Sequence, residues 1–368
     1  MSINNAVNSP YAFPTTTVGS TFGSLAVVTG ATTTGYANIP GKNRLINGNM
    51  QIWQRGAGGS ASFAVNATTA YTADRYQVQS GASTNVTVSQ VADSTSGQFR
   101  MRVQRNVGNT GTGAITIAQS LPRSSCSNFG GSYATYSFQA LVGANFSAAA
   151  SAVTVKVISG QGTSDVSALT TGFTTQVSEV STSQALTTAL VTYTFTTGQM
   201  NSAVSQMAVE ITFTPSGTAG TNDYIDIGYM QLEQSAHATF YEHKTFDEYL
   251  RECQHYFCKS FAYATAPAQN IGNGISEMVF AGTRTAAATN VAPTVAWPVV
   301  MRATPTLTTY STNAATNQVY DVGSSNPCTA ITTYVLSDRA HSIYCTGAAT
   351  SGIGNILVYN WSADAELV

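Results

Sequence analysis

Charge is the property this sequence has least of. Only 9% of its 368 residues are Asp, Glu, Lys or Arg, against about 25% in typical soluble domains. The formal net charge is −2, so no strong field attracts nucleic acid or an anionic membrane surface. The sequence therefore predicts no nucleic-acid partner.

Long apolar runs are also missing. The longest near the start is LAVV (25–28), far short of the roughly 20 residues of a spanning helix. No basic stretch precedes an apolar one, as it would in a secretory signal. We expect a protein that is made in the cytosol and does not insert into a membrane.

Cysteine is scarce and odd in number. The five residues are Cys126, Cys253, Cys258, Cys328 and Cys345. Cys253 and Cys258 flank His255, but a spacing of five on a helix puts the two thiols about 140° apart, so they cannot share a metal ion. We expect small buried side chains there. Cys328 and Cys345 could face each other on neighbouring strands, and we expect reduced thiols.

Sequence patterns of catalysis are absent. The four histidines show no HExxH pattern, and no G-x-S-x-G elbow or phosphate-binding loop occurs. A glycosidase needs two carboxylates across a cleft. Asp223 and Asp226 could be paired on paper, but on a regular strand they point to opposite faces. We predict no enzyme, no catalytic residue, no cofactor and no metal.

Residues that favour strands and turns take the place of charge. Thr, Val and Tyr suit strands, and the 31 glycines suit turns. A hydrophobic content of 43% is enough to build a core. The composition predicts a mainly β protein.

The first 41 residues carry no charged side chain, and Lys42 is the first. Pro10, Pro14 and many small polar residues are typical of an extended arm. We interpret residues 1–42 as an attachment arm that lies on a partner or on sister subunits; the alternative is a disordered leader.

Residues 43–244 show period-two hydrophobicity separated by Gly, Asn and Ser. In FRMRVQR (99–105), Phe99, Met101 and Val103 alternate with polar side chains, which predicts a sheet with one buried face. Some ten such segments predict a single antiparallel β-sandwich.

The period then changes to that of a helix. Thr245 and Glu248 form a capping-box signature, which predicts a connecting helix over 245–262. Its apolar stripe comprises Phe246, Tyr249, Leu250, Cys253, Phe257 and Phe261. Residues 263–368 return to short strands and predict a second, small β domain.

Aromatic side chains without nearby charge suit sugar recognition, because pyranose faces stack on Trp and Tyr rings. The glycan-contact candidates are Trp297, Tyr310, Tyr320, Tyr334, Tyr344 and Trp361. For each of them the alternative is a core or cross-strand aromatic.

Four segments in order resemble a known family. They are NRLINGNMQIWQRG, YTADRYQV, the stretch YMQLEQSAHATFYEHKTFDEYLRECQHYF, and WPVVMRATPTLT with the terminal DAEL. Together they resemble a group of tailed-bacteriophage and prophage virion proteins, usually described as fibre proteins. The family-motif residues are Asn47, Gly48, Gln51, Arg55, Asp74, Arg75, Gln231 and Glu233.

The resemblance implies a carbohydrate-binding-like jelly roll, a short C-terminal β domain, a virion location and a homotrimer. It supplies no catalytic residue. The leading hypothesis is a tail fibre or spike, attached by residues 1–42 to other virion proteins and contacting host glycan. The alternatives are a capsid-decorating, head-fibre or collar protein without a receptor role, and a polysaccharide-degrading enzyme.

The stretch LINGNMQIWQRG (45–56) predicts the first strand of the sandwich, with YMQLEQ (229–234) as its neighbour. Arg55 or Arg75 would then pair with Glu233 or Asp226, among the few acids available. Stacking of Trp53 on a sugar is the alternative to a buried ring.

Overall fold

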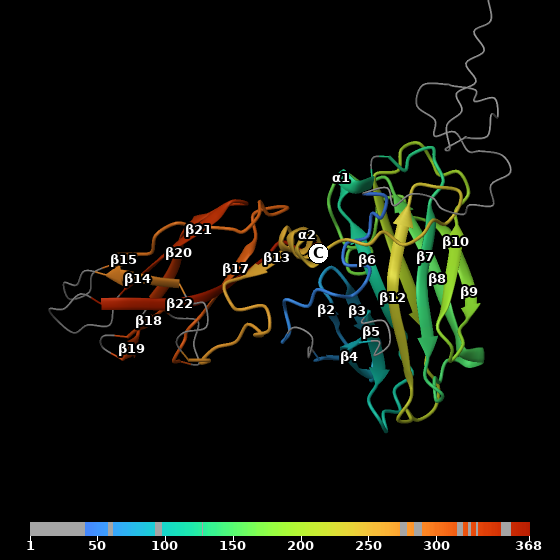
Figure 1. Ribbon diagram of the computed structural model, residues 1–368, viewed down its shortest axis with the longest axis horizontal. Helices are drawn as coiled ribbons and strands as arrows, with labels where there is room; N and C mark the ends of the chain where they lie inside the picture. Colours follow the sequence, from blue (N-terminus) through green and yellow to red (C-terminus); the bar gives the residue numbers. More distant parts are fainter. Residues whose placement is uncertain are drawn as a thin grey trace, which may run out of the picture. The chain divides into compact units, whose positions relative to one another are not determined.

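The computed structural model describes residues 41–57, 62–92, 98–126, 128–272, 278–282, 289–314, 319–322, 325–328, 330–346 and 355–368. These residues belong to one compact unit. Its elements comprise a β-sandwich, a helix and a second group of strands (Figure 1). Residues 1–40, nearly the whole predicted arm, lie outside the described residues.

Two six-stranded antiparallel sheets form the sandwich. The first has the order β1 (Ser62–Asn66), β4 (Asn85–Ala92), β5 (Phe99–Arg105), β12 (Tyr224–Glu233), β7 (Thr135–Val142) and β10 (Val191–Thr196). The second has the order β2 (Thr69–Tyr71), β3 (Gln77–Ser80), β6 (Ile115–Leu121), β11 (Gln206–Phe213), β8 (Ala152–Gly160) and β9 (Val177–Ala185). The prediction of an antiparallel jelly-roll sandwich is confirmed.

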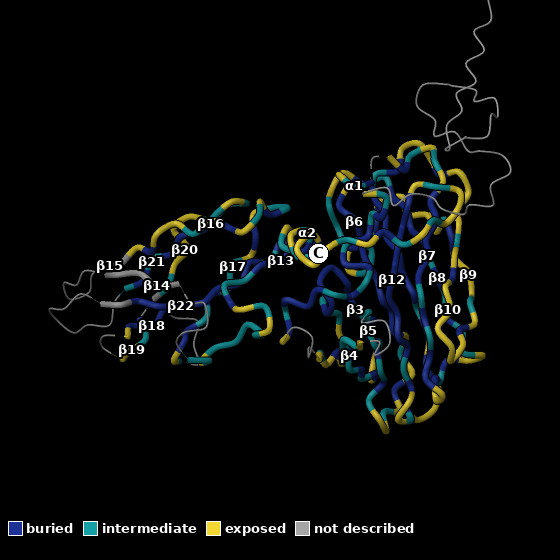
Figure 2. Tube along the Cα trace, in the orientation of Figure 1, coloured by how far each residue is buried: buried dark blue, intermediate teal, exposed yellow. Residues whose placement is uncertain are grey.

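The alternation of side chains explains the burial of the strands. Met101 and Val103 on β5 point into the core, while Arg102 and Gln104, which alternate with them, are only partly buried. On β12, Ile225 and Ile227 face the same core. Figure 2 shows the central strands of the sandwich buried and β9 and β10 largely exposed.

Helix α2 (Phe246–Gln254) begins as predicted. The side-chain oxygen of Thr245 accepts from the Glu248 N–H, and the Glu248 carboxylate accepts from the Thr245 N–H. The helix ends earlier than predicted, because Phe257–Lys259 forms strand β13, which pairs with β22. The only other helical pieces in the described part of the chain are α1 (Arg123–Cys126) and the 3₁₀ turn η2 (Ala149–Ser151). None of the helices in those ranges is long and apolar enough to cross a membrane.

A second group of strands follows. It comprises β14 (Met278–Gly282), β15 (Thr289–Val291), β16 (Val295–Ala296), β17 (Thr306–Tyr310), β18 (Tyr320–Asp321), β19 (Asn326–Pro327), β20 (Ala330–Leu336), β21 (Ala340–Thr346) and β22 (Asn355–Asp364). Strand β22 is central, with β13, β14, β17 and β18 paired to it. These strands enclose a hydrophobic cluster of their own, separate from that of the sandwich.

Residues 45–56 do not form the predicted strand. Asn47 and Met50 adopt left-handed backbone conformations, with φ of 59° and 55°, so the segment is a series of turns. Its predicted neighbour is correct, since the Met230 N–H on β12 donates to the carbonyl of Gly48 at 2.9 Å. Trp53 is fully buried and donates its indole N–H to the Met50 carbonyl, so it offers no ring face to a sugar.

Candidate functional site

The first family motif forms a hydrogen-bonded turn. The Asn47 side-chain oxygen accepts from the N–H groups of Gln51 and Ile52 at 3.0 and 2.9 Å. Its amide donates to the carbonyls of Ile52 and Asp74 at 2.9 and 3.1 Å. Asn47 is fully buried, and these four bonds hold its left-handed turn in place. The carbonyl of Gln51 accepts from the Tyr263 hydroxyl at 3.0 Å.

Close packing on β12 explains the glycine that follows. A Cβ added at Gly48 would lie 2.1 Å from the backbone oxygen of Met230. Any other residue would push the turn away from the sandwich.

The third motif fastens the start of the described chain. The Gln231 side chain accepts from the Glu242 N–H at 2.8 Å and donates to Glu233 at 3.0 Å. The Glu242 carboxylate accepts from the N–H groups of Gly41 and Asn43 at 2.6 and 2.8 Å. Residues 41–43 are thereby fixed against the segment after β12.

Arg55 and Arg75 pair with the C-terminal segment, so the predicted partners Glu233 and Asp226 are wrong. The Arg75 guanidinium forms an ion pair with Glu366, and the side chains of both residues are almost completely buried. Arg55 contacts Asp364 at 3.0 Å and Glu366 at 3.4 Å. The carboxylates that pair with Arg55 and Arg75 are therefore set by contacts between residues far apart in the sequence.

We call this cluster, formed by Arg55, Arg75, Asp364 and Glu366, the arginine junction. Arg75 lies over the Tyr256 ring at 3.6 Å and donates to the carbonyl of Ser120 at 2.8 Å. Burial alone would lower the pKa of Arg55, but the charges of Asp364, Glu366 and Asp74 outweigh it and raise that pKa. Both arginines therefore stay charged inside the protein.

Asp74, from the second motif, is buried next to the junction. It accepts from the backbone N–H and the side-chain amide of Gln54 at 2.8 and 2.6 Å. Burial raises the pKa of Asp74, opposed by Arg55 and by the bonds from Gln54. Residues of the first motif, the second motif and the terminal DAEL segment thus form one structural network.

The two carboxylates considered for hydrolysis are both engaged in ion pairs. Asp223 contacts Arg105 at 2.9 Å, and both side chains are almost fully buried. Asp226 contacts Arg102 at 2.7 and 2.8 Å in a two-pronged pair.

Two of the glycan-contact candidates lie in the core of the second strand group. Trp297 stacks on His341 with ring centroids 4.5 Å apart and contacts Trp361 edge to face at 5.0 Å. Each Trp is 6% exposed, so neither can present a ring face to a sugar. Burial also lowers the pKa of His341 to about 4. This placement argues against the glycan-contact role that we predicted for both tryptophans.

The tyrosines differ from one another. Tyr320 is 9% exposed and belongs to the interior. Tyr310 is partly buried, with its hydroxyl 3.0 Å from that of Ser362. Tyr334 on β20 is 65% exposed, and its ring meets that of Tyr344 on β21 at 6.4 Å. Tyr334 is therefore the most exposed of these tyrosines, and its neighbour Tyr344 is partly buried, as Tyr310 is.

The residues next to Tyr344 can also contact a sugar. Thr332 lies opposite Tyr344 in the register of β20 and β21, and Val291 lies opposite it on the other side, on β15. Thr332 and Val291 are exposed. A partly apolar surface with nearby hydroxyl groups results, and we call Val291, Thr332, Tyr334 and Tyr344 the tyrosine face.

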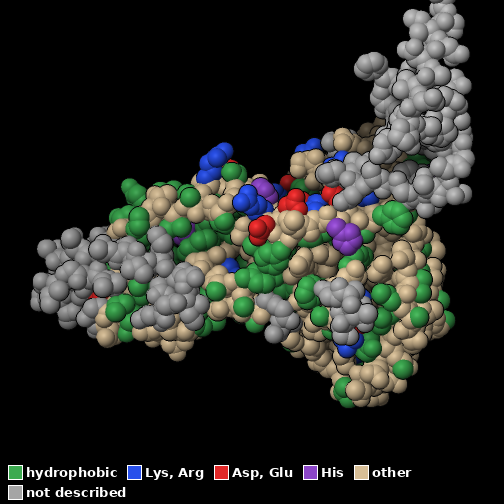
Figure 3. Space-filling model, in the orientation of Figure 1, with side chains coloured by type: hydrophobic (Ala, Val, Ile, Leu, Met, Phe, Trp, Pro, Cys, Tyr) green, Lys and Arg blue, Asp and Glu red, His purple; other side chains and the backbone are tan. Residues whose placement is uncertain are grey.

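A cavity of about 770 Å³ is the second candidate site. Its walls come from five segments: residues 41–46, residues 122–125 at the start of α1, the loop after β8, residues 244–256 with α2, and the segment before β17 that carries Arg302. Its lining comprises Gly41, Asn43, Arg44, Ile46, Pro122, Arg123, Ser124, Ser125, Thr163, Asp165, Lys244, Glu252, His255, Tyr256 and Arg302. Figure 3 shows charged side chains gathered over the region of α2.

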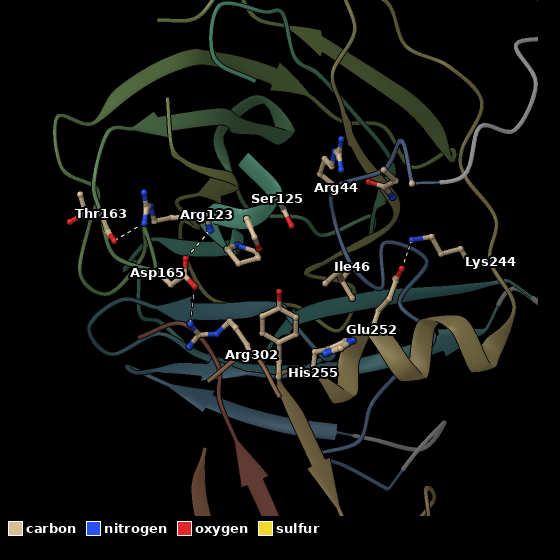
Figure 4. Close-up of a pocket in the computed structure, with 15 residues that line it drawn as sticks. Arg44, Ile46, Arg123, Ser125, Thr163, Asp165, Lys244, Glu252, His255 and Arg302 are labelled. Carbon is tan, nitrogen blue, oxygen red and sulfur yellow. Dashed lines mark hydrogen bonds and ion pairs between the residues drawn. The ribbon is translucent and has the colours of Figure 1, made fainter. Parts of the chain in front are cut away.

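Two ion pairs lie at opposite sides of this cavity (Figure 4). Arg302 contacts Asp165 at 3.1 Å, and the Asp165 carboxylate also accepts from the backbone N–H of Arg123 at 2.8 Å. Lys244 contacts Glu252 at 2.6 Å.

A reactive thiol and a group of metal-ligating side chains would be two further kinds of functional site among the described residues. All five cysteines are buried and unbonded to one another by disulfides. Burial raises the pKa of Cys126 and of Cys258 to about 12. Within the described ranges, no three His, Cys, Asp or Glu side chains are grouped so as to hold a metal ion.

No protein-family model and no curated protein matches the sequence. Similar solved structures include a chain described as CBM4, with 17% identity over 51% of this chain and 98% of that one, at a TM-score of 0.28. A family 11 carbohydrate-binding module from Clostridium thermocellum shows 13% identity over 45% and 91%, at 0.27. Tailspike protein 4 of bacteriophage CBA120 shows 12% identity over 53% and 22%, at 0.30.

These three structures are only weakly similar to this chain. Their identities lie below 25% and their TM-scores below 0.5. The likeness therefore carries no argument about what this chain is or what it binds.

Proposed function

We propose that this chain is a non-enzymatic virion protein of a tailed bacteriophage, a tail fibre or spike that contacts glycan on the host surface. The tyrosine face carries the glycan part of the proposal. Tyr334 combines an open ring, which can stack on a sugar, with a hydroxyl that can bond to it. The virion part rests on the resemblance of the four sequence motifs.

The proposal assigns the other parts of the chain as follows. Residues 1–42 attach the protein to other virion proteins, the sandwich forms the body, and three copies assemble into a homotrimer. Light scattering on the purified protein tests the last point, with an expected mass of three times the 38.4 kDa of one chain. A monomer at micromolar concentration would contradict it.

Glycan binding is tested by Tyr334→Ala on an array of bacterial surface glycans. We expect a two- to tenfold loss of affinity, since a stacked aromatic contact contributes about 0.5–1.5 kcal/mol. Tyr133→Ala is the matched control, because Tyr133 is 43% exposed on the sandwich, away from the tyrosine face. If both variants bind like the wild type, the tyrosine face is not the glycan site.

A second candidate function is a capsid-decorating, head-fibre or collar protein without a receptor role. It is favoured by the placement of the motif residues, most of which are buried and serve the internal network and the arginine junction. Imaging of particles labelled at either terminus distinguishes the two functions. Label on the capsid or collar would favour this second candidate.

A further inference from the structure

The cavity beside α2 concentrates positive charge in a chain that has little. Four of the 15 Lys and Arg residues line it, against two carboxylates. The excess is two formal positive charges. A random share of charged residues would leave such a cavity close to neutral, as the whole chain is at −2.

Two of the four basic side chains in the cavity, those of Arg302 and Lys244, form ion pairs with carboxylates. Arg302 is fully engaged, since it contacts Asp165 and donates to the carbonyls of Ala365 and Glu366 at 2.8 and 3.0 Å. Lys244 is neutralised by Glu252. The remaining charge therefore resides on the two other arginines.

Arg44 and Arg123 are these two arginines. Arg123 donates to the Thr163 carbonyl at 2.8 Å, and no carboxylate contacts its guanidinium among the described residues. Arg44 has no ion pair in the described part of the chain, and its Nε is buried without a hydrogen-bond partner there. Neither arginine is neutralised by a carboxylate within the described ranges, so a bound anion can supply the missing charge.

The rest of the lining is suited to a hydroxylated ligand. Ser124, Ser125 and Tyr256 supply hydroxyl groups, and Asn43 supplies an amide. The volume of about 770 Å³ lies within the roughly 300–1,000 Å³ of small-molecule sites. It is large enough for a sugar.

We propose that this cavity binds an acidic saccharide, whose carboxylate or phosphate is held by Arg44. The shared chemistry is an anionic group on a hydroxylated ring. The cavity contains no residue of the tyrosine face. The test of this proposal is therefore independent of the function proposed above.

The test uses the full chain and measures its thermal shift with glucuronate, glucose 6-phosphate, inorganic phosphate and glucose at equal ionic strength. A ligand that binds only the folded state raises the melting temperature. We expect a rise with glucuronate or glucose 6-phosphate and none with glucose. No rise with either acidic sugar overturns the proposal, and equal affinity for inorganic phosphate overturns its saccharide part.

Variants locate the site. Arg44→Gln should weaken the acidic sugar at least about tenfold, because a hydrogen bond to a charged group contributes about 1.5–3 kcal/mol. Arg251→Gln is the control, since Arg251 is exposed on α2 and does not line the cavity. Equal affinity of the two variants places the ligand elsewhere. Arg44→Lys, which keeps the charge but lacks the planar fork of donors, repeats the test if Arg44→Gln does not fold.

Discussion

Replacing Glu366 by Gln tests the arginine junction. The change keeps the size of the side chain and removes its charge. In the native protein Glu366 is buried and forms an ion pair with Arg75, while Arg55 lies 3.4 Å away. The variant leaves Arg75 as a buried cation whose carboxylate partner is gone.

The expected loss is about 3–5 kcal/mol of unfolding free energy, the range for breaking one side of a buried ion pair. Most of it should come from Arg75, because Arg55 keeps Asp364 at 3.0 Å. Arg75 retains only the Ser120 carbonyl and the Tyr256 ring. The double variant Arg75→Met, Glu366→Leu should lose less than the sum of its parts, since neither charge remains unpaired.

Equilibrium urea unfolding, followed by tryptophan fluorescence, measures these losses. The control is Lys156→Gln, because the Lys156–Glu210 contact is 3.4 Å long and the Lys156 side chain is 33% exposed. Because Lys156 can reach water, we expect this half-buried pair to contribute less than the pair of Arg75 and Glu366, whose side chains are at most 2% exposed. If Glu366→Gln costs no more than Lys156→Gln, the arginine junction does not hold the C-terminal segment in the way we describe.

Three further results are expected. Gly48→Ala should cost about 1–3 kcal/mol in urea unfolding, since its Cβ would lie 2.1 Å from the Met230 oxygen, whereas Gly198→Ala, in open space, should cost little. Burial lowers the pKa of His341 from 6.5 to about 4. As pH falls from 6.5 to 4, the unfolded state therefore binds a proton on His341 before the folded state does. Up to about 3 kcal/mol of unfolding free energy should be lost over this range. His341→Asn should flatten that dependence, and an unchanged curve would contradict it. Burial raises the pKa of thiols such as that of Cys126 to about 12. A thiol reagent at pH 8 should therefore label the five cysteines only after the protein unfolds. Rapid labelling of the native protein would show an accessible thiol and contradict this expectation.

Local patterns made much of the fold predictable. FRMRVQR became β5 because its alternation matches a half-buried strand, and Thr245 with Glu248 started α2 because a capping box needs only four residues. The end of α2 was not predictable in this way. Phe257 continues the helical stripe in sequence, but its pairing with Asp364 on β22, more than a hundred residues later, makes it a strand residue.

Side-chain networks explain the remaining errors. Residues 45–56 alternate like a strand, yet the four hydrogen bonds of Asn47 fold them into turns. The partners of Arg55 and Arg75 come from the terminal DAEL segment, which proximity in sequence could not reveal. Arg44 gave no signal as a site residue, because the cavity it lines is assembled from five separate segments.

The arginine junction also bears on biosynthesis. Arg75 and Glu366 are 291 positions apart, so a ribosome must translate most of the chain between emergence of the arginine and emergence of its partner. During that interval the sandwich holds two cations without their carboxylates, and contacts this distant in sequence form slowly. A chain that stops short of residue 364 never acquires either partner. We expect chains truncated before residue 364 to be unstable and degraded, because both arginines would remain without a carboxylate partner.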